Sequence, residues 1–342
     1  MSQARRFSAP GRVNLIGDHT DYNRGLALPV AIDLATDAVF TPNGSSRITV
    51  LSDAFPTQVD IPLSIPVDPA VLSTWEPAWS RPVAALVALV RPEWGGLLRI
   101  QSTVPVGAGL SSSAALGVSV AVALGATGTP RTIAVLCHQM EQMTDVPVGM
   151  MDPLVSAGAK AGHALLIDFS DLSTAHVPLP EDMDIVVVHS GISRELRFTP
   201  YGARVAECEA AAAVVGPLGA ADDADIAGLR DPILARRTRH VVTECRRVRE
   251  LAGAMAAGDT ARAGRIMLES HRSLAEDFEV STPELDTLVD RLASMDGVHG
   301  ARLTGAGFGG CVVAITEPGA VDLEALGLQA WRVRPSDGAI PA

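Results

Sequence analysis

The chain has 342 residues, of which 47% are hydrophobic and 19% charged, and its formal net charge is -12 at pH 7. This composition is typical of a globular chain that is long enough for two domains sharing a cleft. The acidic balance argues against nucleic acid or an anionic membrane as the main partner, because both reward clustered positive charge. We therefore expect a small-molecule ligand.

The first residues lack the apolar core of a secretory signal peptide, and no run of about 18 uninterrupted apolar residues occurs, so we expect a cytoplasmic protein. Cys137, Cys208, Cys245 and Cys311 lie far apart without a C-x-x-C pair, and the eight histidines show no spacing typical of a metal site. We expect these cysteines to be buried or incidental thiols, neither disulfide partners nor zinc ligands.

Apolar runs broken by turn residues predict strands from Phe7 to about Phe40, followed by a mixture of strands and helices. The other strands predicted in the first half are 48–51, 58–61, 97–100, 163–169 and 184–189. The helices predicted there are 82–90, 132–143 and 152–159. In the second half helical periodicity covers 200–215, 231–257, 260–277 and 283–295, before strands at 301–303 and 311–316. The change from mixed strands and helices to mainly helices predicts a domain boundary near residues 178–180.

A glycine-rich segment, residues 104–115 (Val-Pro-Val-Gly-Ala-Gly-Leu-Ser-Ser-Ser-Ala-Ala), follows a predicted strand and precedes a helical stretch. Gly107 and Gly109 allow positive φ and close backbone approach. Residues 111–113 open a helix whose free N–H groups and dipole attract anions. The segment therefore predicts a phosphate-binding loop, although a structural turn of this composition occurs in many folds.

The sequence excludes one common nucleotide fold and disfavours a second. Lys160 is the single lysine and no G-x-x-x-x-G-K-[ST] occurs, so the usual P-loop is absent. The glycine run at 305–310 comes late and follows helices, which argues against a dinucleotide-binding unit. The phosphate loop must belong to another nucleotide fold.

Residues 10–23 (Pro-Gly-Arg-Val-Asn-Leu-Ile-Gly-Asp-His-Thr-Asp-Tyr-Asn) place a cation, two carboxylates, an imidazole, an amide and a phenol where a predicted strand gives way to a polar loop. A sugar requires acceptors and donors in fixed directions, and an unmatched polar group in a closed pocket costs about 1–3 kcal/mol. The alternative is an exposed loop that merely carries charge.

Three motifs in this order resemble one enzyme family. Residues 10–23 look like the galactokinase signature, residues 104–116 like the ATP loop of the GHMP small-molecule kinases, and residues 303–310 (Leu-Thr-Gly-Ala-Gly-Phe-Gly-Gly) like their third motif. Weaker matches occur at 149–152, 190–191, 201–209, 269–274 and 283–286. The resemblance covers most of the chain and fails chiefly over residues 41–96 and the C-terminal tail.

The resemblance implies a two-domain α/β (α+β) GHMP-kinase fold with mixed sheets and helices and an active site in the interdomain cleft. Residues 1–178 would form the N-terminal domain and residues 179–342 the helix-rich C-terminal domain. It implies transfer of the ATP γ-phosphoryl group to the C1 hydroxyl of α-D-galactose, the first phosphorylation of galactose utilisation. We expect a monomer or weak homodimer.

The resemblance also assigns roles to residues. Asp152 would act as base on the C1 hydroxyl, with Arg12 beside it to favour the ionised carboxylate and to neutralise charge on the phosphoryl group. The sugar contacts it implies are Asp18, His19, Thr20, Asp21, Gly149 and Tyr201. The ATP-binding residues it implies are Gly107, Ala108, Gly109, Leu110, Ser111, Ser112 and Ser113. Ser113 and Glu141 would hold Mg²⁺, completed by phosphate and water oxygens.

Each assignment has a structural alternative. Asp152 could simply start a helix before Pro153, Arg12 could be an ion-pair partner without a role in catalysis, and Tyr201 could be an ordinary aromatic residue at a helix start. Glu141 could equally lie on an exposed helix face.

Three departures from the family pattern bear on specificity and packing. Asp18 stands where the signature usually has Glu, and it is one methylene shorter. Gly117 stands where Glu is common, which we interpret as a change in helix packing. Pro153 replaces Gln after Asp152 and fits a first helical turn. The separation from Glu141 to Asp152 is also one residue shorter than expected.

Two other functions stay open at this point. A sister sugar kinase for N-acetylgalactosamine, arabinose or galacturonate would differ only in the shape of its pocket. A galactokinase-like sensor would bind ATP and sugar without catalysis, and it would have no need of the set Arg12, Ser113 and Asp152.

Overall fold

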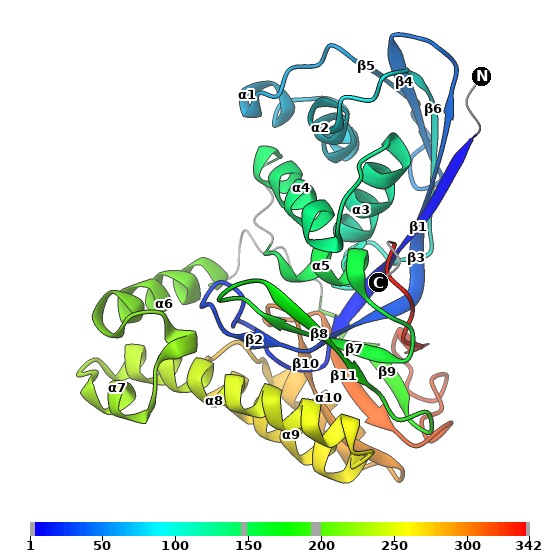
Figure 1. The fold of residues 1–342 in the computed structure, drawn as a ribbon. Helices are drawn as coiled ribbons and strands as arrows, with labels where there is room; N and C mark the ends of the chain where they lie inside the picture. Colours follow the sequence, from blue (N-terminus) through cyan, green and yellow to red (C-terminus); the bar gives the residue numbers. More distant parts are fainter. Residues whose placement is uncertain (1–3, 145–148, 193–199, 340–342) are drawn as a thin grey trace.

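The computed structural model describes residues 4–144, 149–192 and 200–339, and within them the chain forms three sheets covered by helices (Figure 1). The upper sheet has five strands in the order β1-β3-β6-β4-β5. Their bounds are β1 Arg5–Asn14, β3 Pro29–Pro42, β6 Gly96–Ser102, β4 Arg47–Ser52 and β5 Val59–Pro62. Neighbouring strands run antiparallel except β4 and β6, which are parallel.

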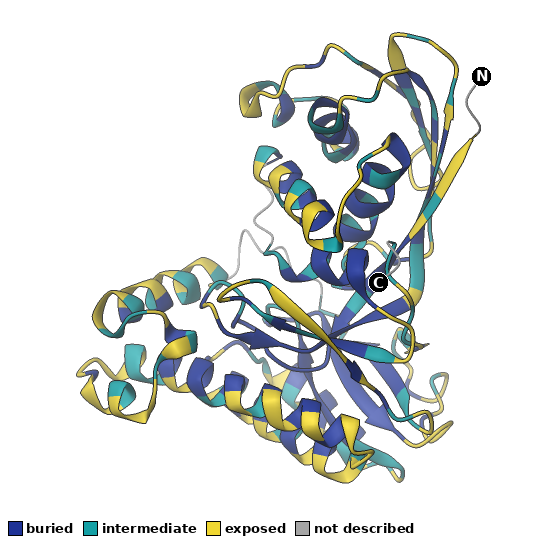
Figure 2. Ribbon diagram, in the orientation of Figure 1, coloured by how far each residue is buried: buried dark blue, intermediate teal, exposed yellow. Residues whose placement is uncertain are grey.

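One face of the upper sheet is buried and the other is exposed, as the alternation of side chains along β6 illustrates. Leu98 and Ile100 point inward while Arg99 and Gln101 are exposed, which is the period-2 pattern of a half-buried strand. The helices beside this sheet are α1 Pro69–Leu72, α2 Arg81–Val90, α3 Ser112–Leu124, α4 Pro130–Met143 and α5 Met151–Gly158. Figure 2 shows α2, α3 and α5 largely buried, whereas α1 and α4 also carry exposed residues.

Helix α3 packs against β1 and β3 and is buried over most of its surface because alanine, valine and glycine dominate its sequence. It ends at Gly125, whose φ of 111° suits a helix C-terminus. A Cβ added to Gly117 would lie 3.2 Å from Met140 and 3.4 Å from Cys137 of α4. Gly117 thus lies where α3 meets α4, as the helix-packing interpretation predicts.

The lower half contains two antiparallel sheets and the longer helices. One sheet has the order β10-β11-β9-β12, with bounds Val298–Thr304, Cys311–Thr316, Asp184–His189 and Ala330–Val333. The other has the order β2-β7-β8, with bounds Leu26–Ala27, His163–Asp168 and Ser173–Pro178. The helices are α6 Tyr201–Val215, α7 Asp223–Gly228, α8 Pro232–Ala256, α9 Thr260–Glu276 and α10 Pro283–Ala293.

Helix starts in the lower half follow from their caps. Asp231 accepts hydrogen bonds from the backbone N–H groups at the start of α8, and Thr282 does so for α10, with Pro at the first helical turn in both cases. Helices α9 and α10 pack on β10. Together with α8 they form the base of the molecule (Figure 1).

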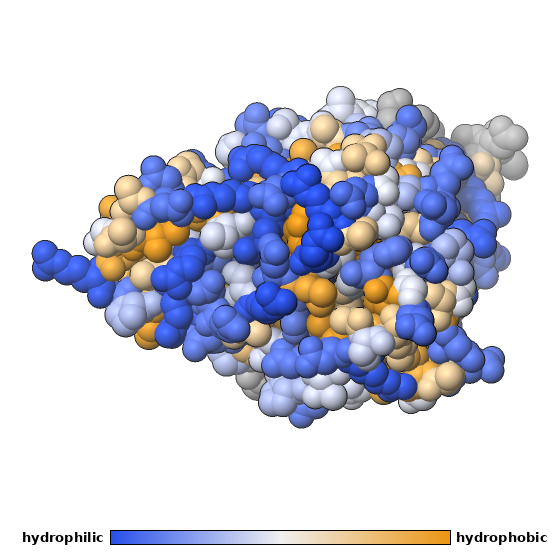
Figure 3. Space-filling view, turned by 90° about the horizontal axis from the view of Figure 1, so that it is seen from below, coloured by the Kyte–Doolittle hydropathy of each residue, from blue (hydrophilic) through white to orange (hydrophobic). Residues whose placement is uncertain are grey.

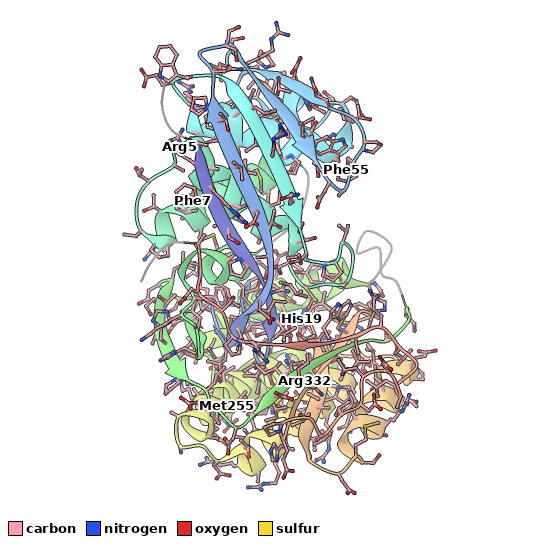
Figure 4. The ribbon with its side chains drawn as sticks, turned by 90° about the vertical axis from the view of Figure 1, so that its right-hand side faces the viewer. Arg5, Phe7, His19, Phe55, Met255 and Arg332 are labelled. Atoms are coloured by element: carbon pink, nitrogen blue, oxygen red, sulfur yellow. The ribbon has the colours of Figure 1, made fainter. Side chains whose placement is uncertain are left out.

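The two halves share structural elements. Strands β1 and β3 run from the upper sheet down into the lower half, and His19 lies just beyond the end of β1 (Figure 4). One hydrophobic cluster contains Leu15 and Ile32 together with Leu303 and Val333. The C-terminal segment returns to β3, where Ile32 forms a β-bridge with Pro335. The boundary near residues 178–180 stays a prediction.

Seen from below, the surface is largely hydrophilic, with hydrophobic residues in separate patches (Figure 3). Among the described residues, no helix combines the length and apolar character that a membrane span requires. The four cysteines are all buried, as the sequence predicts.

Candidate active site

A cavity of about 330 Å³ lies where the sugar-signature segment, the glycine-rich loop and the starts of α5 and α6 come together. It collects most of the predicted site residues from both halves of the sequence. The predicted residues in its lining are Arg12, Asp18, His19, Asp21, Gly107, Gly109, Ser111, Ser112, Ser113, Gly149, Asp152 and Tyr201. Gly17, Tyr22, Met151, Gly305 and Ala306 complete the lining.

The glycine-rich loop has the geometry of an anion-binding turn. Gly107 and Gly109 have φ values of 79° and 78° and Ser111 has 63°, so the predicted positive φ of both glycines is confirmed. Helix α3 begins at Ser112 and receives no cap from the Ser111 side chain, whose hydroxyl instead donates to Asp152. The N–H groups of the first turn are thereby left for a ligand.

Two predicted ATP-binding residues enter this loop only through their backbone. The side chains of Ala108 and Leu110 are buried, and neither residue lines the cavity. The carbonyl of Leu110 accepts from the backbone N–H of Arg12 at 3.1 Å. The Cys311 thiol lies 3.0 Å from the Ala108 carbonyl. These contacts fix the loop against the core.

Asp152 and Arg12 form a bidentate ion pair at the centre of the cavity wall. The Arg12 Nε and Nη2 groups donate to the two carboxylate oxygens at 2.7 and 2.6 Å, and Nη1 donates to the Gly109 carbonyl at 2.7 Å. Ser111 donates to the same carboxylate. Asp152 also lies in the first turn of α5, so it both starts a helix and faces the cavity. The arrangement ties the phosphate loop to a partly exposed carboxylate.

Aromatic side chains enclose the other end of the cavity. His19 has a φ of 63°, and its Nδ1 lies 2.9 Å from the Tyr22 hydroxyl. The His19 ring is 4.6 Å from the Phe278 ring and 5.8 Å from the Tyr201 ring, measured between centroids. Tyr201 is the first residue of α6 and lines the cavity. Tyr201 therefore both starts a helix and lines the site, so the structural alternative does not rule out a role in the site.

Asp21 lies against Gly149 on the same side of the cavity. Burial raises the pKa of Asp21 to about 6, and the negative charges of Asp152 and Asp18 add to the effect against backbone hydrogen bonds that lower it. A Cβ built on Gly149 would lie only 2.2 Å from an Asp21 carboxylate oxygen. The absence of a side chain at residue 149 therefore sets the position of this carboxylate.

Gly149→Ala is expected to displace the Asp21 carboxylate and to raise the KM for the sugar at least about tenfold, because contacts below 3 Å force one of the two groups to move. The KM for the nucleotide should change little. Gly202→Ala is the matched control, since its added Cβ meets nothing within 4 Å. Steady-state kinetics with each substrate varied checks this, and an unchanged sugar KM would contradict the packing argument.

Thr20 differs from the expectation for a sugar contact. Its side chain is fully buried, and its hydroxyl lies 2.8 and 2.7 Å from the carbonyls of Gly17 and Leu26. Thr20 does not line the cavity. Its hydroxyl closes the turn beneath the site, because a buried hydroxyl takes the nearest backbone acceptors.

Asp18 reaches the cavity only marginally, with 3% of its surface exposed. Its carboxylate pairs with Arg302 at 2.7 Å and accepts from the Gly305 N–H at 2.9 Å. Sequence reasoning missed Arg302 and its neighbour Glu244. A lone arginine inside an apolar strand, directly before the third glycine motif, is the signal that could have drawn attention to it.

Glu141 faces inward, so the alternative of a solvated helix face is wrong. It is 1% exposed, and neither carboxylate oxygen has a hydrogen-bond partner within the described part of the chain. Burial and the charge of Asp152 raise the pKa of Glu141 to about 8, and the nearby Ser113 hydroxyl opposes the shift. A buried carboxylate without a partner beside a hydroxyl suits a hard divalent cation.

Three family models match separate parts of the chain. They are the galactokinase galactose-binding signature over residues 2–42, the GHMP kinase N-terminal domain over residues 81–159 and the GHMP kinase C-terminal domain over residues 251–331. Their order agrees with the three motifs that the sequence shows.

Whole-length relatives extend this agreement. The chain is 39% identical to the galactokinase of Homo sapiens over 330 residues, which cover 92% of this chain and 84% of that protein. It is 40% identical to the galactokinase of Chloroflexus aggregans over 332 residues, with the same coverage. The chain belongs to the galactokinase family. The sequence-based resemblance is confirmed.

Solved structures of this family and of other GHMP kinases share the fold. The galactokinase of Lactococcus lactis, complexed with galactose, superposes with a TM-score of 0.89 at 28% identity, covering 98% of this chain and 95% of that one. The mevalonate kinase of Methanococcus jannaschii superposes with a TM-score of 0.72 at 18% identity, over 98% and 99% of the two chains. The predicted mixed α/β GHMP-kinase fold is confirmed.

Proposed function

We propose that this galactokinase-family enzyme transfers the γ-phosphoryl group of ATP to the C1 hydroxyl of α-D-galactose, giving galactose 1-phosphate and ADP. The observation that carries the proposal is one cavity in which the Asp152–Arg12 pair lies between an anion-binding loop and a pocket of polar and aromatic side chains. Such a cavity can bring a phosphoryl donor and a hydroxyl acceptor together.

Asp152 is the group that activates the acceptor. A sugar hydroxyl is a poor nucleophile, and a carboxylate within hydrogen-bond reach can orient it and take its proton as the new P–O bond forms. Arg12 holds both oxygens of this carboxylate. Its guanidinium also places positive charge where negative charge develops on the phosphoryl oxygens. Asp152 and Arg12 thus act as a unit.

The glycine-rich loop holds the ATP phosphates. The positive φ values at Gly107, Gly109 and Ser111 turn the chain toward the start of α3. Backbone N–H groups at a helix N-terminus bind phosphate without a lysine, which agrees with the absence of a P-loop lysine in this sequence. Arg12 donates to the Gly109 carbonyl. This hydrogen bond fixes the loop and the Asp152–Arg12 pair relative to each other.

Ser113 and Glu141 would hold Mg²⁺. The fit rests on the two unpartnered carboxylate oxygens of Glu141 and on the adjacent Ser113 hydroxyl. No group of three or more His, Cys, Asp or Glu side chains suited to a metal occurs in the described chain, so phosphate and water oxygens would complete the coordination. When bound, the ion neutralises charge on the transferring phosphate. Of the described residues, Glu141 would supply the negatively charged ligand.

His19, Asp21 and Tyr201 line the sugar end of the cavity and would set its specificity. Among the described residues that line the cavity there is no lysine to pair a uronate carboxylate, and His19, Asp21 and Tyr201 offer polar groups suited to hydroxyls. We therefore expect galactose to be preferred over galacturonate and N-acetylgalactosamine. Glucose differs at the C4 hydroxyl, and a misplaced hydroxyl leaves a buried polar group unpaired. The intact set Arg12, Ser113 and Asp152 disfavours a sensor without catalysis.

A panel of sugars with Mg·ATP and coupled detection of ADP tests the proposal. Galactose should have the highest kcat/KM, and glucose should be at least about a hundredfold poorer. If N-acetylgalactosamine, arabinose or galacturonate has a higher kcat/KM, that sugar and not galactose is the substrate. No turnover with any sugar, combined with tight ATP and galactose binding, would support the sensor instead.

The pKa of Asp21, raised to about 6, predicts how the sugar KM depends on pH. The ionised carboxylate is the better acceptor for sugar hydroxyls, and it is lost as pH falls below 6. The galactose KM should therefore rise by up to about tenfold per pH unit below this value. His19, Asp18 and Asp152 also line the cavity, so Asp21→Asn is the necessary comparison.

Asp21→Asn should raise the galactose KM at neutral pH and remove the part of the acid limb that Asp21 causes. Measuring kcat and KM from pH 5 to 8 separates the two effects, since only the sugar KM should follow Asp21. An acid limb of the same size in Asp21→Asn would assign it to another group.

A further inference from the structure

A buried cluster of charged side chains lies directly behind the sugar-signature segment. Arg302 of β10 is fully buried, and its Nη2 lies 2.7 Å from the Asp18 carboxylate while Nη1 donates to the Leu15 carbonyl at 3.1 Å. Glu244 of α8 is also fully buried and lies 3.7 Å from the same Nη2. One guanidinium therefore lies between two carboxylates.

Glu244 connects this cluster to the same segment by a second route. Its Oε1 accepts from the Gly17 N–H at 3.0 Å and from the Ser270 hydroxyl at 2.6 Å, and its Oε2 accepts from Arg247 at 2.8 Å. Burial alone would raise the pKa of Glu244, but Arg247 and other neighbouring positive groups outweigh it and lower the pKa to about 2. Glu244 is thus ionised and has Arg247 as its own cation.

The buried negative charge of Asp18 is compensated by the positive charge of Arg302. One carboxylate oxygen accepts from the Gly305 N–H at 2.9 Å and the other pairs with Arg302. The Asp18 carbonyl lies 3.2 Å from Nε2 of His240. With 3% of its surface exposed, Asp18 directs its carboxylate into the protein, where a buried charge requires a partner.

The contacts of Asp18 join two walls of the cavity. His19 and Asp21 follow Asp18 in the sequence, while Gly305 and Ala306 lie on the opposite segment, and all five line the cavity. A hydrogen bond and an ion pair at one carboxylate therefore fix the spacing between the sugar-signature segment and the third glycine motif.

We infer that Asp18 and Arg302 are positioning residues that hold the sugar pocket in shape, and that Asp18 does not itself bind a sugar hydroxyl. The inference rests on the proposed function for its substrate and corrects the expected sugar contact of Asp18. Sugar hydroxyls are left to His19, Asp21 and Tyr201. Specificity then depends on Asp18 through the spacing of the walls.

The decisive experiment compares wild type and Asp18→Asn on galactose and on its 3-deoxy, 4-deoxy and 6-deoxy forms. Asn keeps an oxygen for the Gly305 N–H but removes the charge that pairs with Arg302. The sugar KM should rise about tenfold, with kcat and the ATP KM changed less than about twofold. The same factor is expected for every deoxy sugar that still reacts, because a positioning residue is coupled to no single hydroxyl.

A direct contact gives a different pattern. If Asp18 binds one hydroxyl, the factor disappears for the sugar that lacks that hydroxyl, and this result would overturn the inference. The comparison is run on whichever sugar the panel shows to be preferred. Failure of galactose to react would therefore contradict the proposed function and leave this test intact.

Arg302 is tested as a pair with Asp18. Arg302→Met alone leaves Asp18 without its cation and should lower the melting temperature, whereas Asp18→Asn/Arg302→Met removes both charges and should recover most of it. The sugar KM of the double variant should stay within about twofold of Asp18→Asn. If the sugar KM of the double variant instead rises by the product of the two single effects, Asp18 and Arg302 have independent roles, which would contradict the inference. Arg332→Met, which breaks the 2.7 Å pair with Asp184 outside the cavity lining, should leave the sugar KM unchanged.

Discussion

Asp152→Asn is expected to lower kcat by about two to four orders of magnitude, the range that a positioned base contributes. The substitution preserves shape but removes the proton acceptor and the negative charge that Arg12 holds at 2.6 and 2.7 Å. The KM values for ATP and galactose should change by less than about fivefold, because neither substrate depends on proton transfer for binding. Single-turnover and steady-state assays separate the two quantities.

Ser111→Ala is the matched control for Asp152→Asn. It removes a hydrogen bond to the same carboxylate and leaves the charge and both bonds from Arg12 in place. Its kcat should fall much less than that of Asp152→Asn. If Asp152→Asn keeps kcat within about tenfold of wild type, Asp152 is not the base.

Gly109→Val should raise the ATP KM at least about tenfold, because a φ of 78° costs a residue with a Cβ about 1–2 kcal/mol, and a β-branched one more. The galactose KM should change far less. kcat should fall as well, since the Gly109 carbonyl positions Arg12. Initial rates with ATP and galactose varied in turn give all three values.

Gly44→Val separates strain in the loop from strain in general. Gly44 has a φ of 76°, an added Cβ meets nothing within 4 Å, and it lies in the connection between β3 and β4. Gly44→Val should cost similar stability without changing the ATP KM. Equal ATP KM values in the two variants would mean that the loop has no phosphate-binding role.

Elements with a clear period or clear caps could be predicted from the sequence. Strands β9 and β11 have the predicted bounds, and helices α6, α8, α9 and α10 begin within one residue of the prediction. Strand β8 was missed because its side chains are nearly all exposed and show no alternation. Strand β12 was missed because it has only four residues, and the short helix α7 was missed because none of its residues is buried.

The site divides in the same way. Arg12, Asp152 and the positive-φ glycines lie in local patterns, so their residue types pointed to their chemistry. The burial of Glu141 and the pairing of Asp18 with Arg302 depend on residues more than 200 positions apart or on helix orientation, which local patterns do not encode. The family resemblance implied a sugar contact for Thr20, and only its two carbonyl partners reveal its place beneath the site.

The return of the C-terminal segment to β3 has a consequence for synthesis of the chain. The bridge between Ile32 and Pro335, and the bond from the Ser336 N–H to the Ala31 carbonyl at 3.0 Å, join positions about 300 residues apart. A growing chain cannot make these contacts until residues 335 and 336 have been synthesised. Strand β3 therefore gains these contacts late in synthesis. Removal of residues 330–339 would expose to solvent the part of the core that is synthesised first.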